Sequence, residues 1–366
     1  MQPQDEVFWG ERLTLARDFR GLTQKQLGTE VTASGALISY CESGKMREPS
    51  RNLVGACAEV LGFDASFFYR KTEDMFREEE CSFRHRRSTP EKDKRQIRAH
   101  ATLLGMVVQQ LRAHFDFPQI DLPNLPASSD DDVEKAAEGT RRHWGIGIEG
   151  PIWQVGRVLE HAGVLIVRHL VKSSKVDAFS RQGKTTVIFL NDAVKSSSRW
   201  NFDIGHECGH LVMHGGIHTG DVQTEAQADR FASAFLMPRN AFSREFKASS
   251  FTWPHVFALK RRWHTSAGAI VRRSYDLGLI GSAEYRRSYQ YMSFKGWTKG
   301  EPSEPVFQEP ELLPNAFAAL GKGVDLTLPQ LCRELMFSSK TFKDVTGVEL
   351  PEAPRKRAQI LTMRAS

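Results

Sequence analysis

Apolar residues recur at helical spacing through the first seventy residues of the chain. They are separated by short polar turns and include Leu13, Ala16, Leu22, Leu27, Val31, Leu37, Ile38, Leu53, Ala56, Val60 and Leu61. Apolar positions three or four residues apart lie on one face of a helix. The pattern therefore predicts a compact domain of short helices over residues 1–70.

The pattern changes after this domain. From residue 71 to about 93 the chain is dense in charge and poor in apolar residues, which is typical of a linker or a solvated helix face. A helix is predicted over about 94–115, and three prolines then indicate a loop. We interpret residues 71–129 as a charged linker with a connecting helix.

Helical and extended patterns alternate from residue 130 onward. The periodicity predicts helices over about 133–144, 152–162, 199–214 and 224–236, and strands over 164–168 and 185–190. Helical patterns continue to about 300, and four prolines between 302 and 314 indicate an extended connector. The predicted fold is α+β and predominantly helical. Its predicted parts are an all-helical domain (1–70), the linker and helix (71–129), an α+β domain (130–240), its helical extension (241–300) and a connector with a small helical region (301–366).

Composition adds limits to this picture. At 366 residues the chain is long enough for two or three domains. No apolar run approaches the length of a membrane-spanning helix, and the polar N-terminus lacks the features of a secretion signal. The five cysteines are scattered without a Cys-x-x-Cys pair and are interpreted as reduced thiols. We expect a cytoplasmic protein with no membrane association.

Two histidines stand four residues apart in His206-Glu207-Cys208-Gly209-His210, inside a predicted helix. Residues at this spacing share one helix face, so both imidazoles can bind one zinc ion. Glu207 would act beside them as a general base for a water that zinc activates. Cys208 points away from that face and is interpreted as packed and inert. The alternative is a plain helix with two partly exposed histidines.

A catalytic zinc site needs a third protein ligand. Position 216, where metzincins carry a histidine, is glycine here. His214 lies roughly 12 Å along the helix from His206, because each residue rises about 1.5 Å, and a surface or packing role is favoured for it. Glu225 begins the next predicted helix and could face both histidines across an antiparallel helix pair. The sequence thus favours a site of two histidines and one glutamate, although that second helix could also be plain core.

The region around the motif resembles the ImmA/IrrE family of metallopeptidases over about residues 130–300. The resemblance is carried by Arg199-Trp-Asn-Phe-Asp-Ile-Gly-His-Glu-Cys-Gly-His-Leu-Val-Met-His, Glu225-Ala-Gln-Ala-Asp-Arg-Phe-Ala and Phe235-Leu-Met-Pro. It implies a gluzincin-like α+β domain that binds Zn²⁺ through His206, His210 and Glu225, with Glu207 as the base. Gly205 departs from the small alanine usual in the family.

A helix pair in the N-terminal domain has the form of a helix-turn-helix unit. Thr23 is the expected N-cap of the first helix, and a short turn leads into Ala36-Leu-Ile-Ser-Tyr-Cys-Glu. This stretch resembles the Cro/CI-like (XRE) helix-turn-helix family over about residues 7–70. Docking geometry then places Ser34, Gly35, Ser39 and Tyr40 near base edges, and Gln24, Lys45, Arg47 and Arg51 near the phosphate backbone. A helical domain used only for protein pairing is the alternative, and a homodimer is expected in either case.

Together these features predict a regulator that binds double-stranded operator DNA and carries a zinc-dependent endopeptidase. We expect it to cleave a repressor or another protein partner, or itself, and so to switch gene expression. The strand at 185–190 is expected to offer a free sheet edge to an extended substrate, which favours a protein substrate. The alternative is a transcription factor whose peptidase-like domain senses a ligand or binds a partner without cutting.

Overall fold

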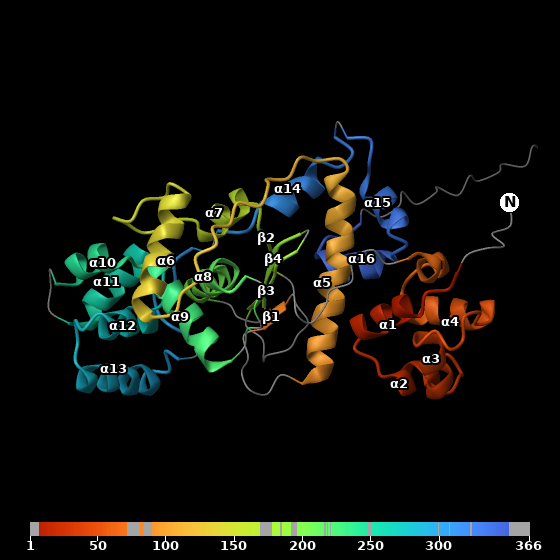
Figure 1. Cartoon of the computed structure of the whole chain (residues 1–366), viewed down its shortest axis with the longest axis horizontal. Helices are drawn as coiled ribbons and strands as arrows, with labels where there is room; N and C mark the ends of the chain where they lie inside the picture. Colours follow the sequence, from red (N-terminus) through yellow and green to blue (C-terminus); the bar gives the residue numbers. More distant parts are fainter. Residues whose placement is uncertain are drawn as a thin grey trace, which may run out of the picture.

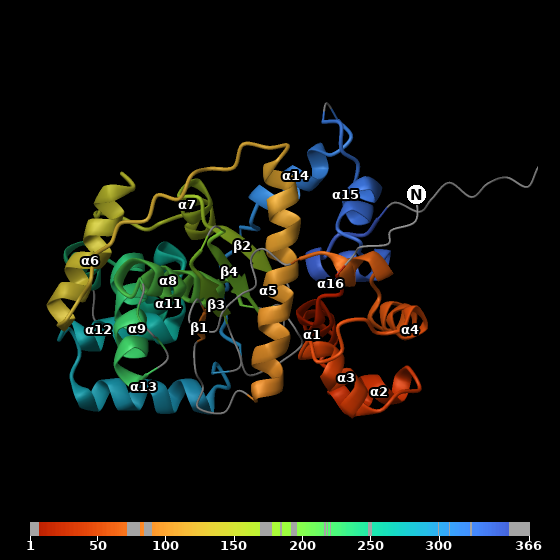
Figure 2. The same ribbon diagram turned by 45° about the vertical axis from the view of Figure 1, so that its right-hand side comes forward.

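The computed structural model describes residues 7–71, 81–83, 90–168, 178–183, 185–191, 196–215, 217, 219, 221–247, 251–298, 300–306, 308–322 and 324–350. A long helix, α5 (Glu91–Arg112), stands near the middle of the molecule (Figure 1). The N-terminal helices lie on one side of it, and the sheet with the helices of the α+β region lies on the other. The turned view in Figure 2 shows the same order. The observed fold is α+β and predominantly helical, as predicted.

The N-terminal helices follow the predicted pattern. They are α1 (Gly10–Phe19), α2 (Gln24–Glu30), α3 (Gly35–Glu42), α4 (Arg51–Leu61) and the short 3₁₀ helix η1 (Ala65–Tyr69). Thr23 and Gln26 form a reciprocal capping box at the start of α2, and Ser34 caps α3. The caps satisfy backbone N–H groups that the first helical turn leaves unpaired. They fix where α2 and α3 begin, and so they fix the turn between these helices.

The connecting helix α5 is a core element. Its buried residues include Ile97, Leu104, Val108 and Leu111. One face of α5 packs on α1, and buried side chains of α5 share a continuous apolar core with the N-terminal helices and with the sheet. Most of the predicted charged linker, residues 72–80 and 84–89, lies outside the described residues. The strongly acidic and basic runs at 78–80 and 84–87 lie outside the described residues.

The sheet contains two strands that the sequence pattern did not predict. Its order is β1-β3-β4-β2, formed by β1 (Cys81–Phe83), β3 (Ala178–Arg181), β4 (Val187–Leu190) and β2 (Leu165–Arg168). β2 pairs parallel to β4, and the other pairs are antiparallel. β4 is therefore a central strand with both edges paired. The expectation that it offers a free edge to substrate is wrong.

The side chains of the strands point alternately into two apolar cores, one on each face of the sheet. Leu165, Val167, Val187 and Phe189 face the core that contains α5, whereas Ile166 and Ile188 face the core around α8 and α9. Successive side chains of a strand point to opposite faces of a sheet. The sheet is thus buried on both sides and joins the N-terminal part of the chain to the region that contains α8 and α9.

The second core is enclosed by helices. They are α6 (Asp130–His143), α7 (Val155–His161), α8 (Ser197–Met213), α9 (Val222–Leu236), α10 (Arg239–Lys247), α11 (Trp253–Trp263), α12 (Ala267–Asp276) and α13 (Ser282–Phe294). α8 packs along α9, and α9 also packs on α6. A buried ion pair between Arg273 and Glu134, with N···O distances of 2.5 and 2.8 Å, ties α12 to α6. This helical frame holds α8 and α9 in place.

A short extended segment after α13 pins three helices together. Lys260 on α11 is fully buried and donates to Glu301 at 2.7 Å and to Glu304 at 2.5 Å. Glu301 also accepts from the backbone N–H of Ala267 at the start of α12. Glu304 accepts from the backbone N–H of Ser198 at the start of α8. The segment therefore fixes the end of α8 that precedes the histidine motif.

The C-terminal helices pack against the N-terminal domain. They are α14 (Leu312–Ala319), α15 (Leu328–Glu334) and α16 (Ser339–Thr346). Phe63 and Phe337 form an isolated antiparallel bridge. Arg20 donates to the Leu61 carbonyl, to Thr341 and to Asp344. The small helical region predicted at 301–366 therefore contributes to the core that contains α5. In the described part of the chain, no helix is long and apolar enough to cross a membrane.

Candidate metal centre and helix-turn-helix surface

Helices α8 and α9 bring three predicted ligands together. His206 and His210 lie one turn apart on α8, and their Nε2 atoms are 3.1 Å apart. Glu225 on α9 approaches both rings, with its Oε2 3.5 Å from His206 Nε2 and its Oε1 3.3 Å from His210 Nε2. One ligand atom from each residue lies within 4.8 Å of the others. Two imidazole nitrogens and a carboxylate thus converge on one point.

Close approach of the two helices depends on glycine. A Cβ atom at Gly209 would lie 3.0 to 3.1 Å from atoms of Phe231, and one at Gly205 would lie 3.4 Å from Ala232. Contacts near 3.0 Å require a neighbour to move, whereas 3.4 Å is ordinary van der Waals contact. Gly209 is therefore needed for the observed α8–α9 spacing, whereas the alanine usual at position 205 would also fit. This spacing sets the distance between Glu225 and the histidines.

A carboxylate orients the first histidine. His206 Nδ1 lies 2.8 Å from Asp229 Oδ1, so the ring donates its Nδ1–H to that carboxylate. A neutral imidazole carries one N–H and one lone pair, which leaves the lone pair on Nε2. Carboxylates in this position fix the tautomer of metal-binding histidines. His206 therefore presents a lone pair toward Glu225 and His210.

A chain of three hydrogen bonds orients the second histidine in the same way. Gln227 Nε2 donates to the Ala127 carbonyl at 3.0 Å, so Gln227 Oε1 can accept from His214 Nε2 at 2.9 Å. His214 Nδ1 is then the acceptor for His210 Nδ1–H at 3.0 Å. Each donor in this chain has one acceptor. The outcome is again a lone pair on the Nε2 atom of His210.

The protonation states suit a cation. Burial lowers the pKa of His210 to about 4, so its ring is neutral near pH 7. Burial raises the pKa of Glu225, but its closeness to the two histidines outweighs burial and brings the pKa to about 2, so Glu225 is a carboxylate near pH 7. The group therefore offers two imidazole nitrogens and one carboxylate. This donor set matches the preference of Zn²⁺, and the residues fit the metal.

Two further residues of the motif are buried on α8. Glu207 follows His206 and is fully enclosed. Cys208 is also fully enclosed in the second core, and burial raises the pKa of its thiol well above the usual value. A thiol that stays protonated in an apolar core is unreactive. The structure agrees with the interpretation of Cys208 as a packing residue.

Three residues that orient the ligands escaped the sequence prediction. Asp229 follows Glu225 by four residues, and this spacing was an available signal that both face α8. Gln227 carried no such signal. A surface or packing role was favoured for His214, yet it is 5% exposed and contacts the nitrogen of His210 that faces away from Glu225. His214 is not one of the residues whose ligand atoms meet in the candidate metal centre, but it is a hydrogen-bond partner of His210.

The helix-turn-helix residues fall into two groups. Ser34, Tyr40, Lys45, Arg47 and Arg51 are exposed, and Ser39 is half-buried beside Tyr40 on α3. Gly35 is a packing position, because a Cβ there would lie 3.1 Å from the Lys25 Cα on α2. Gln24 donates to Glu42 at 2.7 Å, inside a network with the buried Arg17. Gly35 and Gln24 thus stabilise the helix pair itself, and the exposed group forms its outer surface.

Comparison with known proteins separates the same two regions. Residues 10–66 match a family model described as a helix-turn-helix domain. Residues 159–275 match a peptidase family model described as an IrrE N-terminal-like domain. A search of the curated proteins finds no match. The second match contains α8, α9 and all three residues of the candidate metal centre.

Proposed function

We propose that this chain, which joins a helix-turn-helix DNA-binding domain to a peptidase domain of the ImmA/IrrE type, is a zinc-dependent endopeptidase that regulates transcription. Its substrate would be a repressor or another protein partner, the chain itself included. The observation that carries the proposal is the convergence of His206, His210 and Glu225, with both histidines held in the ligand tautomer.

The donor set supports catalysis more than a structural role. A structural zinc site is normally closed by four protein ligands, whereas a catalytic site has three and leaves one position open. Among the described residues, the metal-binding group contains three. When bound, zinc would supply Lewis-acid activation of water and of a carbonyl group.

Glu207 is the residue that we assign to proton transfer. It lies between the two histidines in the sequence of α8 and is fully buried, and we propose that its carboxylate lies beside the bound zinc and its water. There it would take a proton from the attacking water and deliver it to the leaving amide nitrogen as the C–N bond breaks. Asp229, His214 and Gln227 hold the ligand rings and exchange no proton with the substrate.

The exposed surface of α3 and the residues after it support DNA binding. We propose that Ser34, Ser39 and Tyr40 read base edges of an operator, and that Lys45, Arg47 and Arg51 contact phosphates. Gly35 and Gln24 belong to the same proposed interface mainly through packing. Two copies of the chain would bind the two halves of a symmetric operator.

Cleavage is best tested with a pair of carboxylate substitutions. Glu207→Gln should keep about one equivalent of zinc and lose cleavage, whereas Glu225→Gln should lose both. The native substrate can be sought by labelling new protein N-termini in cells that contain either the wild-type chain or the Glu207→Gln chain. Intact mass of the purified, zinc-loaded protein tests cleavage of the chain itself. New termini that appear only with the wild type support the proposal.

Two other outcomes would contradict it. Zinc well below half an equivalent in wild-type protein purified without chelator would remove the metal site. Full zinc occupancy with identical termini in both cell samples would favour a domain that senses or binds without cutting.

DNA binding has its own test. A gel shift with the chain's own promoter should weaken as salt increases and should disappear in an Arg47→Ala, Arg51→Ala double variant. Lys322→Ala, an exposed cation in the C-terminal region, is the matched control. Equal binding by both variants would overturn the assignment of this surface.

A further inference from the structure

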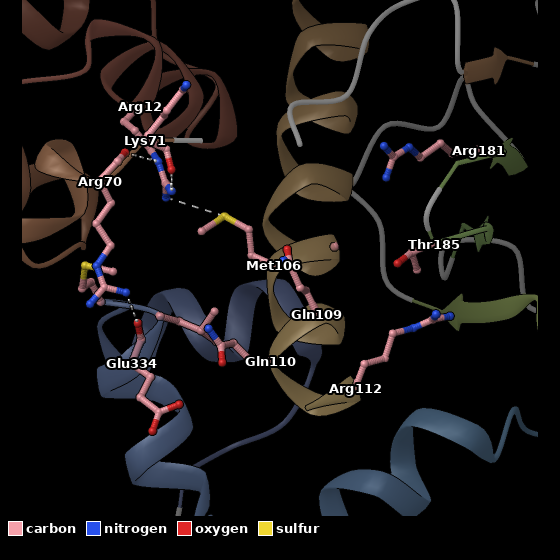
Figure 3. A pocket seen from close by; sticks show the side chains of 13 residues that line it. Arg12, Arg70, Lys71, Met106, Gln109, Gln110, Arg112, Arg181, Thr185 and Glu334 are labelled. Carbon is pink, nitrogen blue, oxygen red and sulfur yellow. Dashed lines mark hydrogen bonds between the residues drawn. The ribbon is translucent and has the colours of Figure 1, made fainter. Parts of the chain in front are cut away.

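A cationic pocket crosses α5 at the junction of four parts of the molecule. Its volume is about 460 Å³, and its walls come from the N-terminal domain, α5, α15 and the turn between β3 and β4. Figure 3 shows cationic side chains on both sides of α5, with Arg12 and Arg70 on one side and Arg181 and Arg112 on the other. Lys71 is a fifth cation in the lining, and Glu334 is the one carboxylate among the described residues that line it.

Two cations of this pocket, the buried Arg12 and the half-buried Arg112, differ from the paired cations elsewhere in the described chain. Lys260, Arg273 and Arg17 each form an ion pair with a carboxylate. Arg141 donates instead to three carbonyl oxygens. A buried charge without such partners is costly, so it is normally compensated. Arg12 and Arg112 have no carboxylate partner among the described residues.

Arg12 shows this most clearly. It is 4% exposed, and its guanidinium donates only to the Arg70 and Lys71 carbonyls and to Met106 Sδ. A guanidinium has five N–H groups, so two remain for another acceptor. Burial lowers the Arg12 pKa to about 10, which reflects the same missing compensation. An anion in the pocket would supply it.

Arg112 and Arg181 complete the far wall. The buried Nε of Arg112 has no hydrogen-bond partner among the described residues. The Arg181 guanidinium lies over Gly183, where a Cβ would be 3.1 Å from its Cζ. Glycine at 183 therefore leaves room for this guanidinium, which is 2% exposed with the rest of its residue. Thr185, Gln109 and Gln110 add neutral hydrogen-bonding groups to the lining.

We propose that this pocket binds a small phosphate ester with at least two phosphoryl groups, such as a nucleotide. Arginine forks match phosphate oxygens, and the volume lies within the usual range for small-molecule sites. Duplex DNA is a poor fit because Arg12 and Arg181 are too deeply buried to reach a duplex backbone. The site is independent of the proposed peptidase chemistry. The walls of the pocket come from the DNA-binding domain and from the sheet, so the ligand would contact both of these parts of the molecule at once.

Calorimetric titration of the full-length protein tests the proposal. The probes are ATP and the linear dinucleotide pApA, with inorganic phosphate as the minimal anion. We expect saturable binding of ATP or pApA that weakens by at least about tenfold in an Arg70→Gln, Arg112→Gln variant, because each substitution removes a charge-assisted contact. Lys92→Gln changes an exposed cation on the same helix outside the pocket and should bind like the wild type.

Three results would overturn the proposal. The first is that no probe binds at millimolar concentration. The second is that the double variant binds the probes as tightly as the wild type. The third is that a 25-base-pair duplex competes with the probes and that the double variant binds this duplex more weakly than the wild type. The last result would assign these cations to the DNA interface. Circular dichroism of both variants separates a lost site from a lost fold, and Gly183→Ala gives a second perturbation that displaces Arg181 without removing charge.

Discussion

Replacing His214 by alanine tests whether the hydrogen-bond chain behind His210 prepares the metal site. The substitution removes the acceptor that lies 3.0 Å from His210 Nδ1. Without it the ring can rotate or place its proton on Nε2, where the metal must bind. Loss of such a partner weakens metal affinity by about 10- to 100-fold, which corresponds to about 1.4 to 2.8 kcal/mol.

Zinc affinity of the folded protein can be measured by competition with a coloured chelator. His214→Gln should recover part of the affinity, because an amide oxygen can accept from His210. His143→Ala is the matched control, since His143 is an exposed histidine paired with Asp121 and far from α9 in sequence. Unchanged affinity in His214→Ala, together with loss in Glu225→Gln, would show that the chain of hydrogen bonds is irrelevant to binding.

Three other perturbations follow from the packing. Lys260→Met leaves two carboxylates without their cation and should lower the free energy of unfolding by about 3 kcal/mol in urea titrations, whereas Lys343→Met, at an exposed pair, should leave it nearly unchanged. Burial raises the pKa of Glu160 above its usual 4.5, so the folded state binds this proton more tightly than the unfolded state, and the free energy of unfolding falls as pH rises from 4.5 through the raised pKa. Glu160→Gln should flatten that part of the stability profile. An unchanged slope would contradict this assignment to Glu160. Gly209→Ala should push Phe231 away and reduce zinc content, which metal analysis would detect; normal content would mean that α8 and α9 adapt without cost.

Local patterns predicted the helices and the ligand triad because their signals lie within short stretches of sequence. The spacing of His206 and His210 fixes their shared face, and the N-cap residues fix helix starts such as that of α2. Glu225 could be chosen because it begins the next amphipathic helix. These inferences need no knowledge of distant contacts.

The missing features depend on contacts between distant segments. β3 has the sequence Ala-Phe-Ser-Arg, which shows little strand signal, and β1 lies within a charged region. Both are strands because a neighbour supplies hydrogen bonds, and their pairing is what makes β4 central. His214 likewise acquires its role from Gln227 on another helix.

The contact between the two ends of the described chain has a consequence for proteolysis. Residues near Gly62 and Ser338 hydrogen-bond to each other, and α14 to α16 complete the core that contains α1 and α5. A single nick between residues 71 and 90 would leave both fragments bound through this core. Such a chain would elute as one species in native size-exclusion chromatography and separate only in denaturant. Release of the DNA-binding half would then require a second event that loosens the C-terminal helices.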